Sequence, residues 1–130
     1  MTTHAHGTFE VTLTPLAPAA GEEPTLGRLL IDKQFLGDLA GLSQGQMLAY
    51  RTEVEGSAGY VALERFTGAL HGRPGALVLQ HNGRMDRGQG TLTITIVPDS
   101  GTGDLAGIAG QMTIDISDGQ HAYVLEYTLT

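Results

Sequence analysis

Apolar and polar residues alternate along several stretches of the chain, which is the pattern of β-strands with two different faces. In residues 9–14, Phe, Val and Leu alternate with Glu and Thr, and Pro15 ends the run. In residues 91–96, every second position is Leu or Ile between threonines, and Pro98 closes the run. Threonine and isoleucine are stiff at χ1 and suit a pleated sheet, so these runs predict strands rather than helices.

Further runs of this kind recur at fairly even spacing, which is typical of a sandwich or a barrel. Glycine and proline mark a turn at residues 71–75, and Asp118-Gly119 is a strong hairpin signal. We expect strands at residues 9–14, 26–37, 45–54, 59–70, 76–84, 91–96, 111–117 and 121–129.

An even number of strands favours closure of the sheet, because closure removes the exposed edges that an open sheet must protect. The best helical window is residues 37–48, where several glycines each cost up to about 1 kcal/mol relative to alanine. We allow only one short helical turn there, around residues 39–43. We therefore predict an all-β fold, a single closed antiparallel barrel of about eight strands over residues 1–130, with an interior that side chains or one small ligand can fill.

A short near-repeat links two distant parts of the chain. Residues 37–42 read Gly-Asp-Leu-Ala-Gly-Leu, and residues 103–108 read Gly-Asp-Leu-Ala-Gly-Ile. Two similar turns, each using glycine at positive φ, explain the repeat without a duplication. We favour that interpretation over a duplicated half-barrel, because the flanking strands do not match.

The charge balance excludes several classes of partner. The net charge is -7, from 14 acidic and 7 basic side chains, so we expect no binding to nucleic acid or to anionic membranes. The chain has no cysteine, which excludes disulfides and thiolate ligands and fits a reducing compartment. Residues 1–7 lack the features of a signal peptide, and no run approaches the roughly 20 apolar residues of a membrane helix. We predict a cytoplasmic location.

The expected hairpin of residues 59–70 and 76–84 holds the best candidates for a binding or catalytic site. Tyr60, Glu64 and Phe66 share one face of the first strand. If the hairpin pairs residues of equal parity, Gln80 and Asn82 join them, because opposed residues point to the same side of a sheet. A desolvated Glu64 would have a raised pKa and could act as a general acid or base.

The opposite face of this hairpin is a competing site, because it carries Arg65 and His81 among apolar residues. Periodicity does not decide which face lines the interior. Without a functional role, Glu64 and Arg65 would form ordinary ion pairs, and His81 would be a hydrogen-bonded buried imidazole. Lys33 lies on an apolar strand face, where it either snorkels to the surface or pairs with a ligand.

Other chemistry has little support in the sequence. His4 and His6 are two residues apart and could face one ion, but they lie near a terminus, where exposed imidazoles are common. We expect no metal site. A Gly-x-Ser-x-Gly motif does not occur, and the glycines of residues 101–110 miss the spacing of a dinucleotide loop, so we expect no cofactor.

Residues 101–110, Gly-Thr-Gly-Asp-Leu-Ala-Gly-Ile-Ala-Gly, resemble a loop of allene oxide cyclases and plant dirigent proteins, with Leu105 in place of an aromatic residue. The whole chain resembles the bacterial domain-of-unknown-function family 3224. The resemblance implies an allene-oxide-cyclase-like barrel and no defined activity. Cyclases and dirigent proteins of the wider group act by positioning a reactive intermediate and excluding water. The matching stretches are residues 7–11, 32–35, 56–60, 72–75, 79–81 and 97–103.

Three functions follow from these patterns. The barrel binds or steers a small apolar molecule in its lumen, with Tyr60, Glu64, Phe66 and Gln80 along the pocket. Alternatively it is a cofactor-free cyclase or isomerase with Glu64 as the acid–base group. In the third alternative it is a packed barrel whose outer face forms a homo-oligomer, in the simplest case a dimer. A lumen of roughly 300 Å³ or more near Glu64 favours the first function, and a lumen filled by side chains contradicts it.

Overall fold

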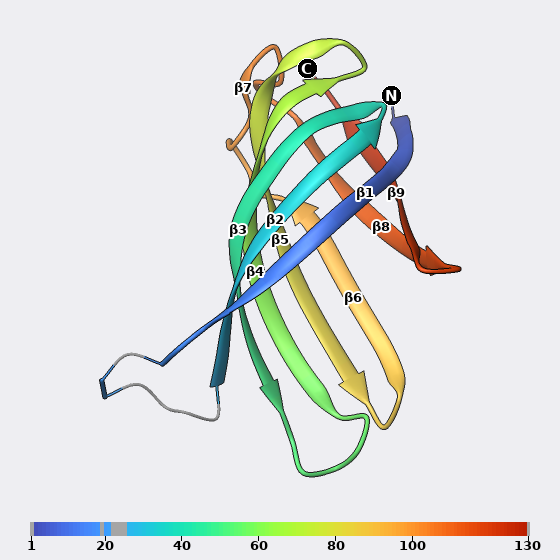
Figure 1. The fold of residues 1–130 in the computed structure, drawn as a ribbon. Coiled ribbons are helices and arrows are strands. Elements are labelled where there is room, and N and C mark those ends of the chain that lie inside the picture. Colours follow the sequence, from blue (N-terminus) through green and yellow to red (C-terminus); the bar gives the residue numbers. More distant parts are fainter. Residues whose placement is uncertain (1, 19, 22–25, 130) are drawn as a thin grey trace.

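The computed structural model describes residues 2–18, 20–21 and 26–129, and this part of the chain is built from β-strands and turns without a helix (Figure 1). None of these residues forms a helix that could span a membrane. The strands are β1 (Thr3–Leu16), β2 (Leu26–Gly37), β3 (Leu39–Arg51), β4 (Ala58–Leu70), β5 (Arg73–Asp86), β6 (Gln89–Ile96), β7 (Thr102–Gly103), β8 (Ala109–Ser117) and β9 (Gln120–Thr128).

Eight of these strands close into an antiparallel barrel, which confirms the predicted fold. The strands pair in the order β1-β2-β3-β4-β5-β6-β8-β9, and β9 returns to β1. The short β7 is an extra strand that pairs with β5 beyond the end of β6. Most connections are tight hairpins, so neighbours in sequence are also neighbours in the sheet.

The expected helical turn at residues 39–43 is wrong, because these residues begin β3. Leu39 is fully buried and pairs with Leu70 of β4, and its backbone N–H and C=O also bond the Tyr123 hydroxyl. β1 also begins earlier than the pattern indicated, since Thr3 already pairs with Tyr127 of β9.

Each half of the near-repeat begins with a glycine at positive φ. Gly37 and Gly103 have φ values of 104° and 62°, in the left-handed region that favours glycine. Each repeat also supplies one leucine, Leu39 or Leu105, that is completely buried in the core. The two segments are not similar turns, because residues 39–42 belong to β3 whereas residues 104–107 form a turn, but the positive φ of the first glycine is common to both.

The end of the barrel that carries β7 and the turn at residues 71–72, here called the closed end, is filled by side chains. Phe35 stacks edge-on against Phe66 and Tyr123, with ring centroids 5.8 and 5.4 Å apart. The Tyr123 hydroxyl accepts a hydrogen bond from the Leu39 N–H at 2.9 Å. Other core residues at this end are Leu70, Leu77, Leu79, Leu105, Ile108 and Leu125.

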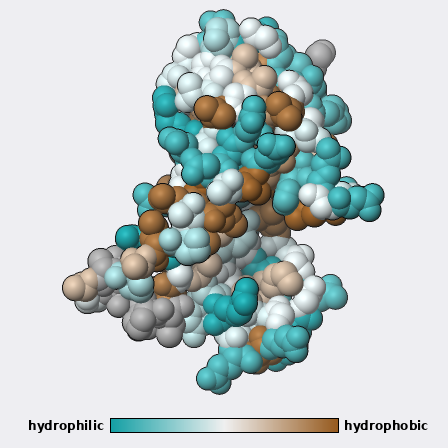
Figure 2. All heavy atoms as spheres, in the orientation of Figure 1, coloured by the Kyte–Doolittle hydropathy of each residue, from teal (hydrophilic) through white to brown (hydrophobic). Residues whose placement is uncertain are grey.

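The opposite end, which carries the turns at residues 52–57 and 87–88, is here called the open end. The β8–β9 hairpin stops about halfway along the barrel (Figure 1). Beyond Phe9, β1 therefore pairs with β2 alone, and before Ile94, β6 pairs with β5 alone. The barrel wall is consequently incomplete here, and the inner faces of its strands are accessible. Figure 2 shows apolar side chains gathered across the middle of the molecule, between the two ends.

Candidate functional site: a cavity with a buried polar floor

The register of the β4–β5 hairpin decides which side chains face the interior. Glu64 lies opposite Leu79, and Ala62 lies opposite His81, so inward residues have even numbers on β4 and odd numbers on β5. The connecting turn has only two residues, His71 and Gly72, because Leu70 already pairs with Arg73. The prediction of equal parity assumed a five-residue turn and was wrong.

This register separates the residues that the sequence had grouped together. Gln80 and Asn82 are exposed on the outside of the barrel, where they line a hollow of about 670 Å³ between β2 and β5. Arg65 is also exposed, and its Nη1 donates to Thr67 Oγ1 at 3.2 Å. Neither predicted face occurs as proposed, because Glu64 and His81 point inward together.

A cluster of four polar side chains, here called the Glu64 cluster, crosses the interior from four adjacent strands. The Lys33 ammonium and the His81 Nε2 approach the same carboxylate oxygen, Glu64 Oε1, at 2.8 and 2.7 Å. The Ser43 hydroxyl donates to the other oxygen, Oε2, at 2.8 Å. All four residues are buried, and only 1% of the surface of Glu64 is exposed. Both oxygens of the carboxylate are therefore engaged.

The strand registers explain how these groups meet. Lys33 pairs with Ser43 across β2 and β3, and Gly45 pairs with Glu64 across β3 and β4. A Cβ atom on Gly45 would lie 2.0 Å from the Leu63 carbonyl oxygen and 2.8 Å from the Glu64 Cβ. Glycine at this position thus allows β3 to approach β4 closely beside the carboxylate.

Ser43 is a member of the cluster that the sequence pattern did not reveal, because a helical turn was expected around residues 39–43. The signal that could have found it is parity. Ser43 lies an even number of positions from the apolar and small residues of β3 that face inward, so it shares their face of the strand. The strand itself follows a tight turn after β2.

The environment of Glu64 keeps its carboxyl group ionised. Burial raises its pKa, but the hydrogen bond from His81 and the charge and hydrogen bond of Lys33 outweigh burial and lower the pKa from 4.5 to about 2. The expected rise in pKa is therefore wrong. A carboxylate with this pKa does not donate a proton at neutral pH, and it instead holds Lys33 and His81 in place.

Lys33 is buried rather than snorkelling to the surface. Its ammonium lies 4.6 Å from the centre of the Phe9 ring and 5.7 Å from that of Phe35, within cation–π range. His81 is the buried, hydrogen-bonded imidazole that the sequence allowed. Both residues lie between the packed closed end and the cavity.

Between the Glu64 cluster and the open end, the lumen widens into a cavity of about 530 Å³. Lys33 and His81 form the floor of this cavity, and Glu64 lies behind them. The ring of Tyr60 lines the wall and packs over Gly83, where a Cβ atom would lie 2.1 Å from a ring carbon. Phe66 does not reach the cavity and belongs to the closed end. Apolar wall residues include Phe9, Val11, Ile31, Met47, Ala49 and Ala62.

The two N-terminal histidines lie on the outer surface, away from the cavity. The rings of His4 and His6 stack with their centroids 6.5 Å apart, and His4 Nε2 lies 3.6 Å from a Glu126 oxygen. Within residues 2–18, 20–21 and 26–129, no three His, Asp or Glu side chains gather as a metal site.

Comparison with known proteins places this barrel in a family. The family model described as "Protein of unknown function (DUF3224)" matches residues 5–127. The chain belongs to the DUF3224 family. A crystal structure of a DUF3224 protein of unknown function from Shewanella oneidensis MR-1 has a TM-score of 0.93 and 45% identity, covering 100% of this chain and 98% of that one. None of the curated proteins matches the chain.

The DUF3224 assignment agrees with the fold described above. The closed antiparallel barrel is consistent with the allene-oxide-cyclase-like architecture that the sequence resemblance implied. The family description and the related structure name no activity. The function of this DUF3224 barrel must therefore be argued from its own site.

Proposed function

We propose that this DUF3224 barrel binds a small, largely apolar molecule in the cavity at its open end. The observation that carries the proposal is the cavity itself, which combines a volume of about 530 Å³ with apolar walls and two polar groups at the floor. Ligand pockets in proteins have volumes of about 300–1,000 Å³, mostly apolar walls and a few convergent polar groups.

The rim of the cavity supports the same proposal. Leu92 and Met85 are 43% and 44% exposed, and Ile116 is 64% exposed, although all three line the cavity. Covering apolar surface is worth about 25 cal/mol per Å², so a ligand that covers these side chains gains binding energy from them. An accessible apolar surface of this kind commonly marks a binding site.

A cavity-filling substitution tests the proposal. Ala49 lines the cavity, whereas its neighbour Leu48 lies on the outer face of the same strand. We expect Ala49→Trp to weaken binding of the uncharged fluorescent probe N-phenyl-1-naphthylamine by about tenfold or more, because the indole occupies the ligand volume. Leu48→Trp serves as the control and keeps wild-type binding. Equal binding to both variants, or no binding to the wild type, would contradict the proposal.

The hypothesis of a cofactor-free cyclase or isomerase stays a prediction, and no observation favours it over binding. General-acid catalysis by Glu64 would require a proton on a carboxylate whose pKa is about 2, and a carboxylate with so low a pKa is a weak general base. Both of its oxygens are also already hydrogen-bonded. Steering of a reactive ligand by shape alone needs neither group and remains compatible with the binding proposal.

The predicted homo-oligomer is an independent proposal that concerns the outer face. Leu48, Val61 and Leu63 are 43–54% exposed there and lie beside one another across β3 and β4. Native mass spectrometry of the purified protein measures the subunit number, and a dimer is the expected result. The cytoplasmic location likewise stays a prediction.

A further inference from the structure

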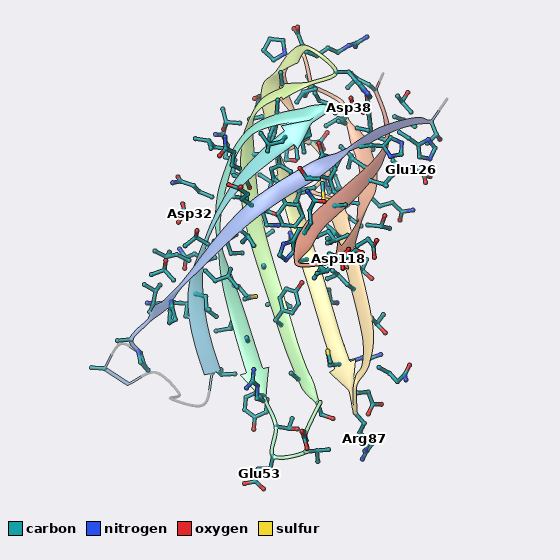
Figure 3. The ribbon with its side chains drawn as sticks, turned by 45° about the vertical axis from the view of Figure 1, so that its right-hand side comes forward. Asp32, Asp38, Glu53, Arg87, Asp118 and Glu126 are labelled. Atoms are coloured by element: carbon teal, nitrogen blue, oxygen red, sulfur yellow. The ribbon has the colours of Figure 1, made fainter. Side chains whose placement is uncertain are left out.

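At pH 8, where an ordinary imidazole is neutral, the charges of the side chains around the cavity cancel. Lys33 and Glu64 form a buried ion pair, with 2.8 Å between Nζ and Oε1, so each neutralises the other. Arg84 also lines the cavity, but strand register turns its side chain outward, since the inward residues of β5 have odd numbers. No Asp or Glu occurs among the cavity-lining residues that the structure describes, and the labelled Asp32 and Glu126 point away from the barrel (Figure 3). An ionic ligand would therefore be buried without a counter-charge, which favours a neutral ligand.

His81 offers a hydrogen-bond acceptor at the floor of the cavity. Its Nε2 lies 2.7 Å from Glu64 Oε1, and because the ionised carboxylate has no proton, Nε2 carries the proton of this bond. In the neutral ring the other nitrogen, Nδ1, then has a lone pair and accepts a hydrogen bond. Within the described residues Nδ1 has no hydrogen-bond partner, and it is not sealed from solvent. Because His81 points inward and lines the cavity, this lone pair is available to a donor on a ligand.

Lys33 offers hydrogen-bond donors at the same floor. Its ammonium has three N–H groups, and Glu64 Oε1 is the one hydrogen-bond acceptor it contacts in the described part of the chain. The Lys33 Nζ and the His81 Nε2 approach this same oxygen, so the ammonium and the imidazole lie beside each other. A donor and an acceptor are thus neighbours at the floor of the cavity.

A hydroxyl group matches this pair, because its one oxygen both donates and accepts a hydrogen bond. An ether, a ketone or a carboxylate only accepts, and would leave the His81 lone pair without a donor. A protonated amine only donates, and would place a second positive charge beside Lys33. A buried polar group that loses its water without gaining a partner weakens binding, so each of these ligands fits less well than a hydroxyl.

We propose that the ligand is a neutral, largely apolar hydroxyl compound, whose hydroxyl donates to His81 Nδ1 and accepts from the Lys33 ammonium while its apolar part extends toward the open end. This inference rests on the proposed function, because it names the chemical class of the molecule that the cavity takes. The cavity matches such a ligand along its depth, with one donor and one acceptor at the floor and aliphatic or aromatic groups along the wall.

A series of compounds with one alkyl chain tests this inference on the wild-type protein. We measure displacement of N-phenyl-1-naphthylamine at pH 8 by octanol, 1-fluorooctane, octanoate and octylamine. Octanol and 1-fluorooctane have nearly the same shape, but only octanol has an O–H group. Octanol should displace the probe at a concentration about tenfold or more below that of 1-fluorooctane, because its hydroxyl forms one neutral and one charge-assisted hydrogen bond. A cavity that recognised apolar surface alone would instead favour 1-fluorooctane, which is the more apolar of the two. Both ions should be weaker competitors than octanol.

The outcomes separate this inference from the proposed function. Equal or stronger displacement by 1-fluorooctane, or stronger displacement by octanoate or octylamine than by octanol, would overturn the hydroxyl assignment while apolar binding stands. Failure of the probe and of every compound to bind would overturn the proposed function itself.

Substitutions locate the hydroxyl. His81→Phe removes the acceptor and keeps a ring of similar size, and Lys33→Met/Glu64→Gln removes the donor together with its counter-charge, which avoids an unpaired buried carboxylate. Each should reduce the preference for octanol over 1-fluorooctane by about threefold or more, because each removes one of the two hydrogen bonds. Arg65→Gln changes a residue of the outer face and should keep the full preference. The wild-type preference in either of the first two variants would place the hydroxyl elsewhere and overturn the inference, and the wild-type series decides the case of a variant that does not fold.

Discussion

Glu64 is the residue on which the interior of this barrel depends. Its carboxylate is hydrogen-bonded to Lys33, Ser43 and His81, and the residue is almost completely buried. Desolvation of two buried charges offsets much of their attraction, so such a pair is weak evidence of a stabilising role. The position of Lys33 and His81 at the floor of a cavity gives the cluster a second use, which is to hold the Lys33 ammonium and the His81 ring toward the cavity.

A double-mutant cycle measures how strongly the buried pair is coupled. Lys33→Met and Glu64→Gln should each lower the free energy of unfolding by about 3–5 kcal/mol, because each leaves one buried group without its partner. The double variant should lose clearly less than the sum of the two. Urea denaturation gives the values, with Arg65→Gln as a surface control that changes stability by less than about 0.5 kcal/mol. Additive losses would contradict the coupling.

The lowered pKa of Glu64 also predicts a pH dependence of stability. The folded pKa is about 2 and the reference pKa is 4.5, so the stabilisation is complete above pH 4.5 and is lost as the pH falls toward 2. The loss amounts to about 3 kcal/mol for a shift of this size. Unfolding free energies measured across this pH range should fall more steeply for the wild type than for Glu64→Gln. Identical slopes would show that Glu64 is not the group responsible.

At the scale of the elements, strand register determines which side chains meet. The sequence predicted β2 at its observed bounds and β4 within one residue, because alternation and glycine mark both clearly. It did not predict the parity of the β4–β5 hairpin. The turn there has His71 at φ 49° followed by Gly72 at φ 79°, so histidine stands where asparagine or aspartate usually marks such a turn. Because this turn lacks an Asn-Gly or Asp-Gly signal, the sequence did not predict on which face of the sheet Gln80, Asn82 and His81 lie.

The close approach of β3 to β4 predicts a sensitive glycine. Gly45→Ala should lower the unfolding free energy by about 1–3 kcal/mol, because the new methyl group overlaps the backbone of β4 beside Glu64. Gly90→Ala is the matched control, since a Cβ atom there would meet nothing within 4 Å. Thermal unfolding of the two variants distinguishes them. Equal melting temperatures would show that the strands separate without cost.

At the scale of the whole molecule, the barrel has a packed end and an open end. The sequence suggested both a filled barrel and a barrel with a ligand cavity. The closed end matches the first description, and the open end matches the second. The difference arises from strand length, since β8 and β9 have 9 residues each and β5 has 14. The sequence indicated shorter C-terminal strands, but alternation alone does not reveal that their hairpin leaves part of the wall open.

The central claim, that the lumen binds a small apolar molecule, is tested most directly by intermolecular NOEs between bound N-phenyl-1-naphthylamine and the methyl groups of the protein. The inward Val11 and Ile31 line the cavity, whereas Val61 and Leu63 lie on the outer face. We expect NOEs from the probe to Val11 and Ile31 and none to the outer pair. NOEs confined to Val61 and Leu63, or none to any methyl group at a saturating probe concentration, would contradict the claim.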